Sequence, residues 1–367
     1  MTVGSLGYGL LGCGMMGQEH LRNIALLPDA HVAAILEPDA VMRAAARRLA
    51  PDARMVDRLE DLLGPEVDCL LIASPNHLHL DQLEAVAAIR SLPVLVEKPL
   101  FTDPSDGARV AALGKRLPLV WVAMEYRYMP PVARFLADAE RATGGIRMLT
   151  IREHRFPFLS KVGDWNRFNV NSGGTFVEKC CHFFDLMRLA LGADPVRVMA
   201  SGGQAVNHLD ESYDGQVPDI WDHGYVIVDF ENGARAMLEL CMFAEGSRYQ
   251  EEITAVGALG KIECLVPGPG RFWPTHLGPV PVPQVIVSPR SPAGPRLLEI
   301  PVDPALLAAG DHNGSTFHEH RRFVDAIQGR RRVEVTLDDG AWAVRMGMAA
   351  QVSACEGRAV MMTEFRS

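Results

Sequence analysis

Residues 6–17 read LGYGLLGCGMMG, an apolar run followed by the pattern G-x-G-x-x-G at Gly12, Gly14 and Gly17. In such a pattern the first glycine permits a tight turn, the second lets the backbone approach a pyrophosphate, and the third lets the next helix pack closely on the strand. The N–H groups at the start of that helix then hold the anion. Because a helical pattern follows at residues 16–27, the segment predicts the first βα turn of a dinucleotide-binding domain.

An acidic residue, Glu37, follows Gly17 by twenty residues, at the end of the next predicted strand. A carboxylate in that place accepts hydrogen bonds from an adenosine ribose and repels a 2′-phosphate, and no lysine or arginine lies beside it. We therefore expect NAD rather than NADP, bound by Gly12, Cys13, Gly14, Met15, Met16 and Glu37. The alternative is a glycine turn with an unrelated surface acid, which the strand–turn–helix context disfavours.

Short apolar strands alternate with helical segments through the first part of the chain. The strands are predicted at residues 6–11, 31–36, 69–73, 94–96 and 119–123, and the helices at residues 16–27, 41–49, 81–89 and 107–116. Alternation of this kind produces a parallel sheet with helices on both faces. We therefore predict an α/β Rossmann domain over residues 1–125.

After about residue 128 the strand-like runs follow one another. They lie at residues 148–152, 197–200, 225–230, 234–241, 252–256 and 262–265. Helices are expected at about residues 176–191 and 315–327, and the proline- and glycine-rich residues 267–304 predict an irregular excursion with at most short strands. Residues 126–367 are therefore expected to form an α+β domain with a large, mostly antiparallel open sheet, whose C-terminal segment can pack back on the first domain.

Composition narrows the class of protein. The 367 residues carry a formal net charge of −9, which disfavours a nucleic-acid partner and a protein held on an anionic membrane. The seven cysteines include no C-x-x-C pair and fit reduced thiols better than disulfides or a zinc site. The N-terminus lacks the basic region of a secretory signal, so we expect a cytoplasmic protein.

Two further loops follow predicted parallel strands, at the sheet edge where ligands of open α/β sheets bind. The first contains Ser74, Asn76 and His79 in the run SPNHLH, and the second contains Glu97 and Lys98 in the run EKP. The proline favours an extended Lys98, whose side chain would point into the crevice. From the tripeptide alone, a solvated loop cation is the simpler interpretation.

The motifs taken together resemble the glucose–fructose oxidoreductase and inositol dehydrogenase family across nearly the whole chain. They are the glycine loop, Glu37, the SPNHLH run, the EKP run, and a later G-G-x-x-x-acid-x-x-x-H-x-x-D pattern from Gly173 to Asp185. The resemblance implies that Lys98, Glu178 and His182 surround a substrate hydroxyl, and that Ser74, Asn76, His79, Glu97, Lys98 and Arg127 line the cofactor site. The family usually has aspartate at the place of Glu178 and often glycine at the place of Cys180.

If the late motif is one helix, Glu178 and His182 share a face because they are four residues apart. Lys179, one residue further on than Glu178, is then expected to point away from that face, although it is a possible extra polar group. Asp185 is expected to be a structural partner, and Cys180 and its neighbour Cys181 to pack the helix rather than act as nucleophiles.

The chemistry that follows is hydride transfer between a secondary alcohol of a sugar, anhydrosugar or cyclitol and nicotinamide C4. His182 is the expected general base, Glu178 the group that fixes the geometry, and Lys98 the group that stabilises the oxygen and can share the proton if burial lowers its pKa. A polyol needs donors, acceptors and an aromatic face, and the candidate substrate residues are Tyr126, Arg155, Trp165, Asn166, Arg167 and Lys179.

Several alternatives stay open. The same family contains glycosidases that use NAD as an internal redox relay, and a nucleotide-sensing regulator without catalysis is the non-enzymatic possibility. A metal site at His312, His318, Glu319 and His320 is disfavoured, because the two histidines of an H-E-H run leave a helix on different faces. The family pairs its subunits through the second-domain sheet, which implies a homodimer or homotetramer.

Overall fold

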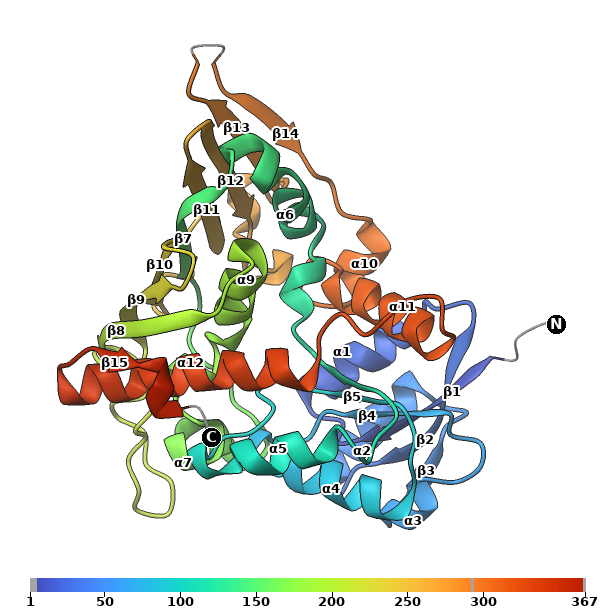
Figure 1. The fold of residues 1–367 in the computed structure, drawn as a ribbon. Coiled ribbons are helices and arrows are strands. Elements are labelled where there is room, and N and C mark those ends of the chain that lie inside the picture. The colour runs from blue at the N-terminus through green and yellow to red at the C-terminus, as the bar shows by residue number, and fades with distance from the viewer. Residues whose placement is uncertain (1–4, 292–293, 366–367) are drawn as a thin grey trace.

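The computed structural model describes residues 5–291 and 294–365. In this part of the chain the first domain contains a six-stranded, entirely parallel sheet in the order β3-β2-β1-β4-β5-β6. Its strands are β1 Leu6–Leu11, β2 Ala30–Leu36, β3 Arg54–Val56, β4 Cys69–Ile72, β5 Val94–Val96 and β6 Val120–Val122. Its helices are α1 Met15–Ile24, α2 Ala40–Leu49, α3 Leu59–Leu62, α4 His79–Ile89 and α5 Gly107–Leu113 (Figure 1).

The second sheet has nine strands among the described residues, in the order β14-β13-β12-β11-β7-β10-β9-β8-β15, and every neighbouring pair is antiparallel except β7 and β10. The strands are β7 Ile146–His154, β8 Pro195–Gly203, β9 His223–Phe230, β10 Arg235–Cys241, β11 Glu251–Gly257, β12 Gly260–Val266, β13 Gln284–Pro289, β14 Arg296–Glu299 and β15 Val360–Met361. The predicted fold class, a Rossmann domain followed by a large open sheet, is confirmed.

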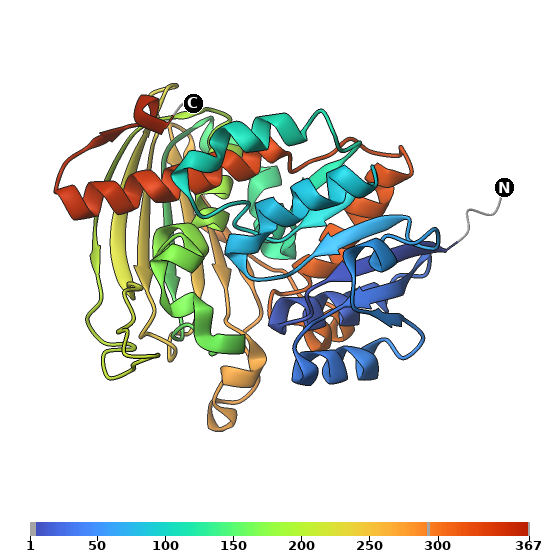
Figure 2. The same cartoon turned by 90° about the horizontal axis from the view of Figure 1, so that it is seen from below.

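Helices cover one face of this sheet and leave the other open (Figure 2). The helices of the second half are α6 Pro130–Thr143, α7 Asn169–Ser172, α8 Thr175–Glu178, α9 Cys181–Leu191, α10 Pro304–Ala309, α11 Ser315–Ile327 and α12 Leu337–Glu356. On the open face Met148 and Tyr225 expose 61% and 55% of their surface. Large apolar side chains are thus exposed on the uncovered face of this sheet.

The chain returns to the first domain near its end. Helix α11 packs against α1, and the rings of His320 and Phe323 lie 5.5 and 6.2 Å from the ring of Tyr8 on β1. After α11 the backbone pairs with the edge of the first sheet, where Val122 N–H donates to the carbonyl of Val335 at 3.2 Å. The C-terminal segment therefore contributes to the core beneath the glycine loop. No helix in the described ranges is long and apolar enough to span a bilayer.

The predicted helix over residues 176–191 is wrong in one respect, because it is broken between α8 and α9. At the break the carbonyl of Glu178 accepts the Lys98 ammonium at 3.0 Å and the Cys181 thiol at 3.8 Å. Helices α6, α10 and α12 and strand β3 were not predicted. Helix α6 begins with two prolines, of which the first occupies the position that a helix tolerates best.

Candidate active site

The glycine loop has the geometry that a dinucleotide requires. Gly12 has φ +84°, and a Cβ there would lie 2.7 Å from the Cα of Ser74, whereas a Cβ on Gly17 would lie 2.8 Å from the carbonyl oxygen of Gly12. A Cβ on Gly14 would meet nothing within 4 Å. Gly14 thus borders open space at the N-terminus of α1, where N–H groups lack intrahelical partners. A pyrophosphate fits this space and these donors.

Glu37 lies at the end of β2, beside this loop. One carboxylate oxygen accepts the N–H of Cys13 and the other accepts the N–H of Asp39 at 2.8 Å. No arginine is next to Glu37 in the sequence, but the fold brings one close. Arg43 on α2 donates to the carbonyl of Glu37 at 3.4 Å. Arg43 is held by Asp57 at 2.7 Å. Its charge is therefore already paired, which leaves the carboxylate of Glu37 as the group that faces a ribose.

The two loops after β4 and β5 are tied together. The ring of His79 lies 2.8 Å from the carbonyl of Pro99 and 3.0 Å from that of Ser74. Burial lowers the pKa of His79, so the ring is neutral and one nitrogen donates. Glu97 is buried and lies 2.8 Å from the ring of His20 on α1, which fastens the EKP loop to the helix that follows the glycines. These contacts fix the backbone from which Lys98 extends.

Lys98 is partly buried, and its Nζ donates to the carbonyl of Glu178 at 3.0 Å. The peptide bond between Lys98 and Pro99 is cis. Burial acts to lower the pKa of Lys98, but the negative charge of Glu178, followed by those of other acidic groups, raises it above its ordinary value. The condition under which Lys98 could share the proton, a pKa lowered by burial, is therefore not met. Lys98 stays an ammonium that donates hydrogen bonds.

The side chain of Glu178 crosses to the first domain. Its carboxylate accepts the side-chain amide of Asn76 and pairs with Lys161 at 3.2 Å. Burial acts to raise the pKa of Glu178, but Lys161 and then Lys98 lower it, so the group is a carboxylate. Glu178 thus contacts Lys98 through its backbone carbonyl, while its carboxylate binds Asn76 and Lys161.

His182 is 2% exposed and stacks on Tyr126, with ring centroids 4.0 Å apart and planes 5° from parallel. Its Nδ1 is buried and has no hydrogen-bond partner. Burial, followed by the charges of Lys98 and Lys179, lowers the pKa of His182 well below its ordinary value. The imidazole is therefore neutral at physiological pH, which is the form that can accept a proton.

Lys179 points into the site, contrary to expectation. Because α8 ends at Glu178, the side chain of Lys179 turns inward, where its Nζ donates to the hydroxyl of Tyr126 at 2.7 Å and pairs with Glu153 at 2.9 Å. Arg155 also reaches Glu153, at 3.3 Å. The structure thus brings Tyr126, Arg155 and Lys179 together beside His182.

Other predicted site residues lie elsewhere. Trp165 lies under the ammonium of Lys161, 4.4 Å from its ring centroid. Three more predicted residues bind other groups of the protein. Asn166 donates to the carbonyl of Leu159, and Arg167 donates to Glu211. Arg127 donates to Asp185 and to the carbonyl of Glu334. The buried Arg127–Asp185 pair agrees with a structural role for Asp185. Burial raises the pKa of Cys181 to about 12 and that of Cys180 well above its ordinary value, which fits packing rather than nucleophilic chemistry.

Sequence reasoning missed two acids on the covered face of the second sheet. Glu153 on β7 and Glu251 on β11 are buried, and the strand register places them opposite each other. The signal was available for β7, where the buried positions Leu149 and Ile151 are followed, in the same alternation, by Glu153. An acid on the apolar face of a strand is a candidate for a functional role.

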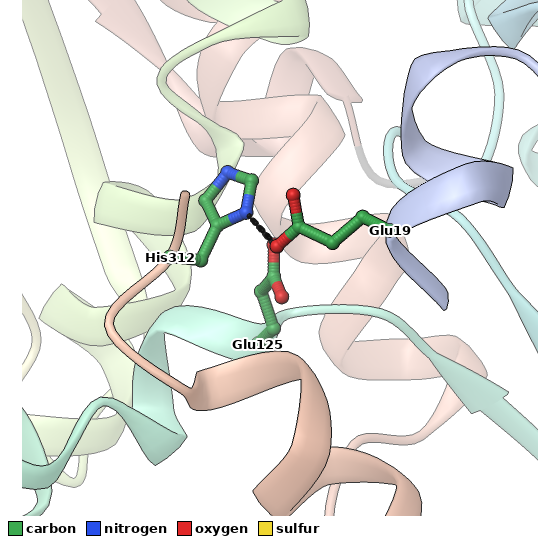
Figure 3. A group of neighbouring side chains, drawn as sticks. All are labelled: Glu19, Glu125 and His312. Carbon is green, nitrogen blue, oxygen red and sulfur yellow. Dashed lines mark hydrogen bonds and ion pairs between the residues drawn. The ribbon is translucent and has the colours of Figure 1, made fainter. Parts of the chain in front are cut away.

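A second missed group joins three distant segments. Glu19 on α1, Glu125 after β6 and His312 before α11 converge, and their ligand atoms lie within 4.8 Å of one another (Figure 3). His312 Nδ1 lies 2.8 Å from Glu19 and 3.4 Å from Glu125, and Thr316 donates to Glu125 at 2.5 Å. Burial acts to lower the pKa of His312, but Glu125 and Glu19 raise it to about 9. In the H-E-H run His318 is partly exposed and His320 buried, on different faces of α11.

Comparison with known proteins places both halves of the chain in one family. The sequence model described as the oxidoreductase family, NAD-binding Rossmann fold, matches residues 6–126, and that of the same family's C-terminal alpha/beta domain matches residues 140–362. An inositol 2-dehydrogenase of Corynebacterium glutamicum is 32% identical over 198 residues, which are 53% of this chain and 56% of that protein. The chain thus spans little more than half the length of this relative.

Two further relatives match nearly the whole chain. A myo-inositol 2-dehydrogenase of Thermotoga maritima is 24% identical over 97% of this chain and 98% of its own length. The solved structure of a levoglucosan dehydrogenase with NADH and levoglucosan superposes with a TM-score of 0.79 at 21% identity, covering 97% of this chain and 99% of that one. At this identity the structural match establishes the fold alone.

Proposed function

The chain belongs to the oxidoreductase family with an NAD-binding Rossmann fold and a C-terminal alpha/beta domain, and from that premise we propose that it oxidises a secondary alcohol of a sugar, anhydrosugar or cyclitol. The observation that carries the proposal is the buried Nδ1 of His182, which has no partner and lies in the field of the Lys98 ammonium. A neutral base and a nearby cation are what the oxidation of an alcohol needs.

Each group has a defined task in this proposal. NAD, when bound, accepts the hydride at nicotinamide C4. His182 accepts the proton of the reacting hydroxyl, since its ring is neutral beforehand, and the burial and neighbouring cations that lower its pKa also make it a weaker base. Lys98 donates a hydrogen bond to the same oxygen and stabilises its developing negative charge. Glu178 holds Lys98 in place through its carbonyl. Asn76 and Glu178 join the two domains across the site.

The direct test uses two variants and one control. Lys98→Met and His182→Asn should each lower kcat by about 100-fold or more, while NAD still binds, because a positioned acid or base contributes about 10²- to 10⁴-fold. Lys115→Met removes an exposed lysine of the first domain and should leave kcat unchanged. Turnover near the wild-type rate in either site variant would remove that residue from the chemistry.

One panel of candidate substrates identifies the substrate class and distinguishes the dehydrogenase from the two alternative functions. Neutral cyclitols, sugars and anhydrosugars are offered with free NAD, and the absorbance of NADH is followed. A dehydrogenase accumulates NADH. A relay glycosidase would release product without NADH, and a nucleotide-sensing regulator would bind NAD and turn over nothing. Repetition with NADP tests the cofactor preference, which the paired Arg43 and the carboxylate of Glu37 support.

The uncovered face of the second sheet supports a homo-oligomer. Met148, Tyr225 and Ile227 expose 61%, 55% and 41% of their surface there. Their pattern follows the strands, since every second residue points outward. A second copy of this chain would bury this face by symmetry, which makes a homodimer or homotetramer the expected assembly.

A further inference from the structure

Three buried polar atoms without a hydrogen-bond partner occur around the candidate site. They are Nδ1 of His182, Oε2 of Glu153 and Oε2 of Glu251. The three residues are 2%, 0% and 2% exposed. Buried polar groups in folded proteins almost always have a partner, so each orphaned atom calls for an explanation. The proposed base function explains the orphaned atom of His182, but nothing in that function explains the two carboxylate oxygens.

The two carboxylates are half-satisfied in the same way. Oε1 of Glu153 receives Lys179 at 2.9 Å and Arg155 at 3.3 Å, and Oε1 of Glu251 receives the side-chain amide of Gln250 at 2.6 Å. In each case one oxygen is fixed by the protein and the other is left as an acceptor. The register pairs Glu251 directly with Glu153 across β11 and β7, so the two acceptors come from adjacent strands of the same sheet face.

These acceptors are connected to the catalytic groups. Lys179 bonds both Glu153 and the hydroxyl of Tyr126, and Tyr126 stacks on His182. The negative charges of Glu153 and Glu251 also act on Tyr126. The covered face of the second sheet, which carries Glu153 and Glu251, therefore forms a floor that is linked to His182 through Lys179 and Tyr126. A substrate whose reacting carbon lies at His182 would extend its other carbons toward this floor.

We propose that Glu153 Oε2 and Glu251 Oε2 each accept a hydrogen bond from a hydroxyl of the substrate remote from the reacting carbon, so that the substrate is an uncharged polyol with at least three hydroxyl groups. This inference rests on the proposed dehydrogenase function. It assigns the two glutamates the selection of the substrate rather than the chemistry. A carboxylate oxygen without a donor is the usual partner of a sugar or cyclitol hydroxyl, because it can only accept.

Charge selects among the possible ligands. Glu153 and Glu251 are balanced by Lys179 and Arg155, so the cluster is neutral when all four groups are ionised. A uronic acid would bring a third carboxylate against two acceptor oxygens, and an amine would leave an uncompensated positive charge in a buried place. A hydroxyl supplies the missing donor without adding charge. Burial and then the charge of Glu153 raise the pKa of Glu251 to about 7, so the ionised form, which can only accept, predominates above that pH.

The experiment is a thermodynamic cycle in which one change is made in the protein and the other in the substrate, and their effects on kcat/KM are compared. The probe is the best neutral polyol of the panel, compared with analogues of it that each lack one remote hydroxyl. In the wild-type enzyme, loss of a hydroxyl that meets one of these oxygens should lower kcat/KM by about 10- to 100-fold, because the buried acceptor is left unpaired. In Glu251→Gln the intact polyol should lose a similar factor, mainly through KM, and one of the deoxy analogues should lose little more.

The controls separate folding, function and recognition. Glu252→Gln changes the neighbouring residue, which points to the other face and pairs with Arg152 at 3.2 Å, and should leave kcat/KM unchanged. Glu153→Gln also removes the partner of Lys179 and is retained only if its melting temperature and NAD binding match the wild type. If Glu251→Gln and every deoxy analogue lower kcat/KM independently, so that their effects multiply, the recognition proposal is overturned. If the wild type oxidises no polyol, the proposed function itself fails.

Discussion

The open space over Gly14 makes a sharp prediction for Gly14→Ala. Gly14 has an extended backbone conformation, with φ −64° and ψ −156°, and an added Cβ would meet nothing within 4 Å. Alanine is therefore tolerated by the protein without NAD, and its smaller unfolded-state entropy stabilises a compatible site by about 0.4–1 kcal/mol. The new methyl group would nevertheless occupy the space next to the helix N-terminus, where we expect the pyrophosphate.

The loss of NAD affinity can be estimated from the contact that the methyl group would displace. A hydrogen bond from a backbone N–H to a charged phosphate contributes about 1.5–3 kcal/mol, so its loss weakens binding by about 10- to 150-fold. At an NAD concentration of about 100 times the wild-type dissociation constant, NAD stabilises the wild-type protein by about 2.7 kcal/mol. A variant that binds 100-fold more weakly gains only about 0.4 kcal/mol at the same concentration.

The assay is thermal unfolding with and without NAD, supported by calorimetric titration. Gly14→Ala should melt at or slightly above the temperature of the wild type when NAD is absent and should lose most of the NAD-induced rise in melting temperature. Gly12→Ala is the contrasting variant, because φ +84° and a Cβ 2.7 Å from the Cα of Ser74 should destabilise the protein even without NAD. Wild-type NAD affinity in Gly14→Ala would refute the placement of the pyrophosphate over this glycine.

Three other predictions concern stability and assembly. Asp185→Asn removes the nearer of the two carboxylates that pair with the buried guanidinium of Arg127, the other being Asp339 at 3.6 Å, and should lower the free energy of unfolding by up to about 3–5 kcal/mol in a urea titration. Glu60→Gln, in an exposed pair, should change it by less than about 1 kcal/mol. The pKa of His312 is raised from 6.5 to about 9, so its stabilising contribution is fully present below pH 6.5 and is lost as the pH rises through 9. His312→Gln should therefore flatten the dependence of the free energy of unfolding on pH between 6.5 and 9. An unchanged slope would contradict the assignment. Tyr225→Glu places a charge on the open sheet face and should reduce the mass found by light scattering to that of one chain. Val41→Glu, which changes an exposed residue of α2, should leave the mass unchanged. A wild-type protein with the mass of one chain would contradict the proposed assembly.

The elements that the sequence predicted well are those with a strong local signal. Strands β1 and β5 and helix α11 begin and end where their apolar patterns indicated. The missed elements lack such a signal. Strand β3 has only three residues. Helix α12 is buried on several sides between the second sheet and the first domain, so its twenty residues show no single apolar stripe.

Residues of the candidate site that belong to a continuous motif could be predicted from the sequence. Residues that are brought together only by the pairing register of distant strands could not. Lys98 and His182 were assigned through the family resemblance, whose motifs are runs of neighbouring residues. Glu153 and Glu251 are 98 residues apart and meet only because β7 and β11 pair at that register. Glu19, Glu125 and His312 likewise come from three separate segments. No local pattern specifies which distant acid will face which distant cation, since that depends on strand order and on the return of the C-terminal segment.

The break between α8 and α9 links the one failed helix to the assembly of the site. In an unbroken helix the carbonyl of Glu178 would accept the N–H of residue 182. Instead it accepts the Lys98 ammonium of the first domain, and the partly buried cation stays charged because Glu178 lies beside it. The altered direction of the chain turns Lys179 inward to Tyr126 and Glu153, and leaves the Glu178 carboxylate free to reach Asn76. A shorter aspartate at position 178 would reach less far toward Asn76. The longer acid and the broken helix thus act together to fasten the two domains around His182.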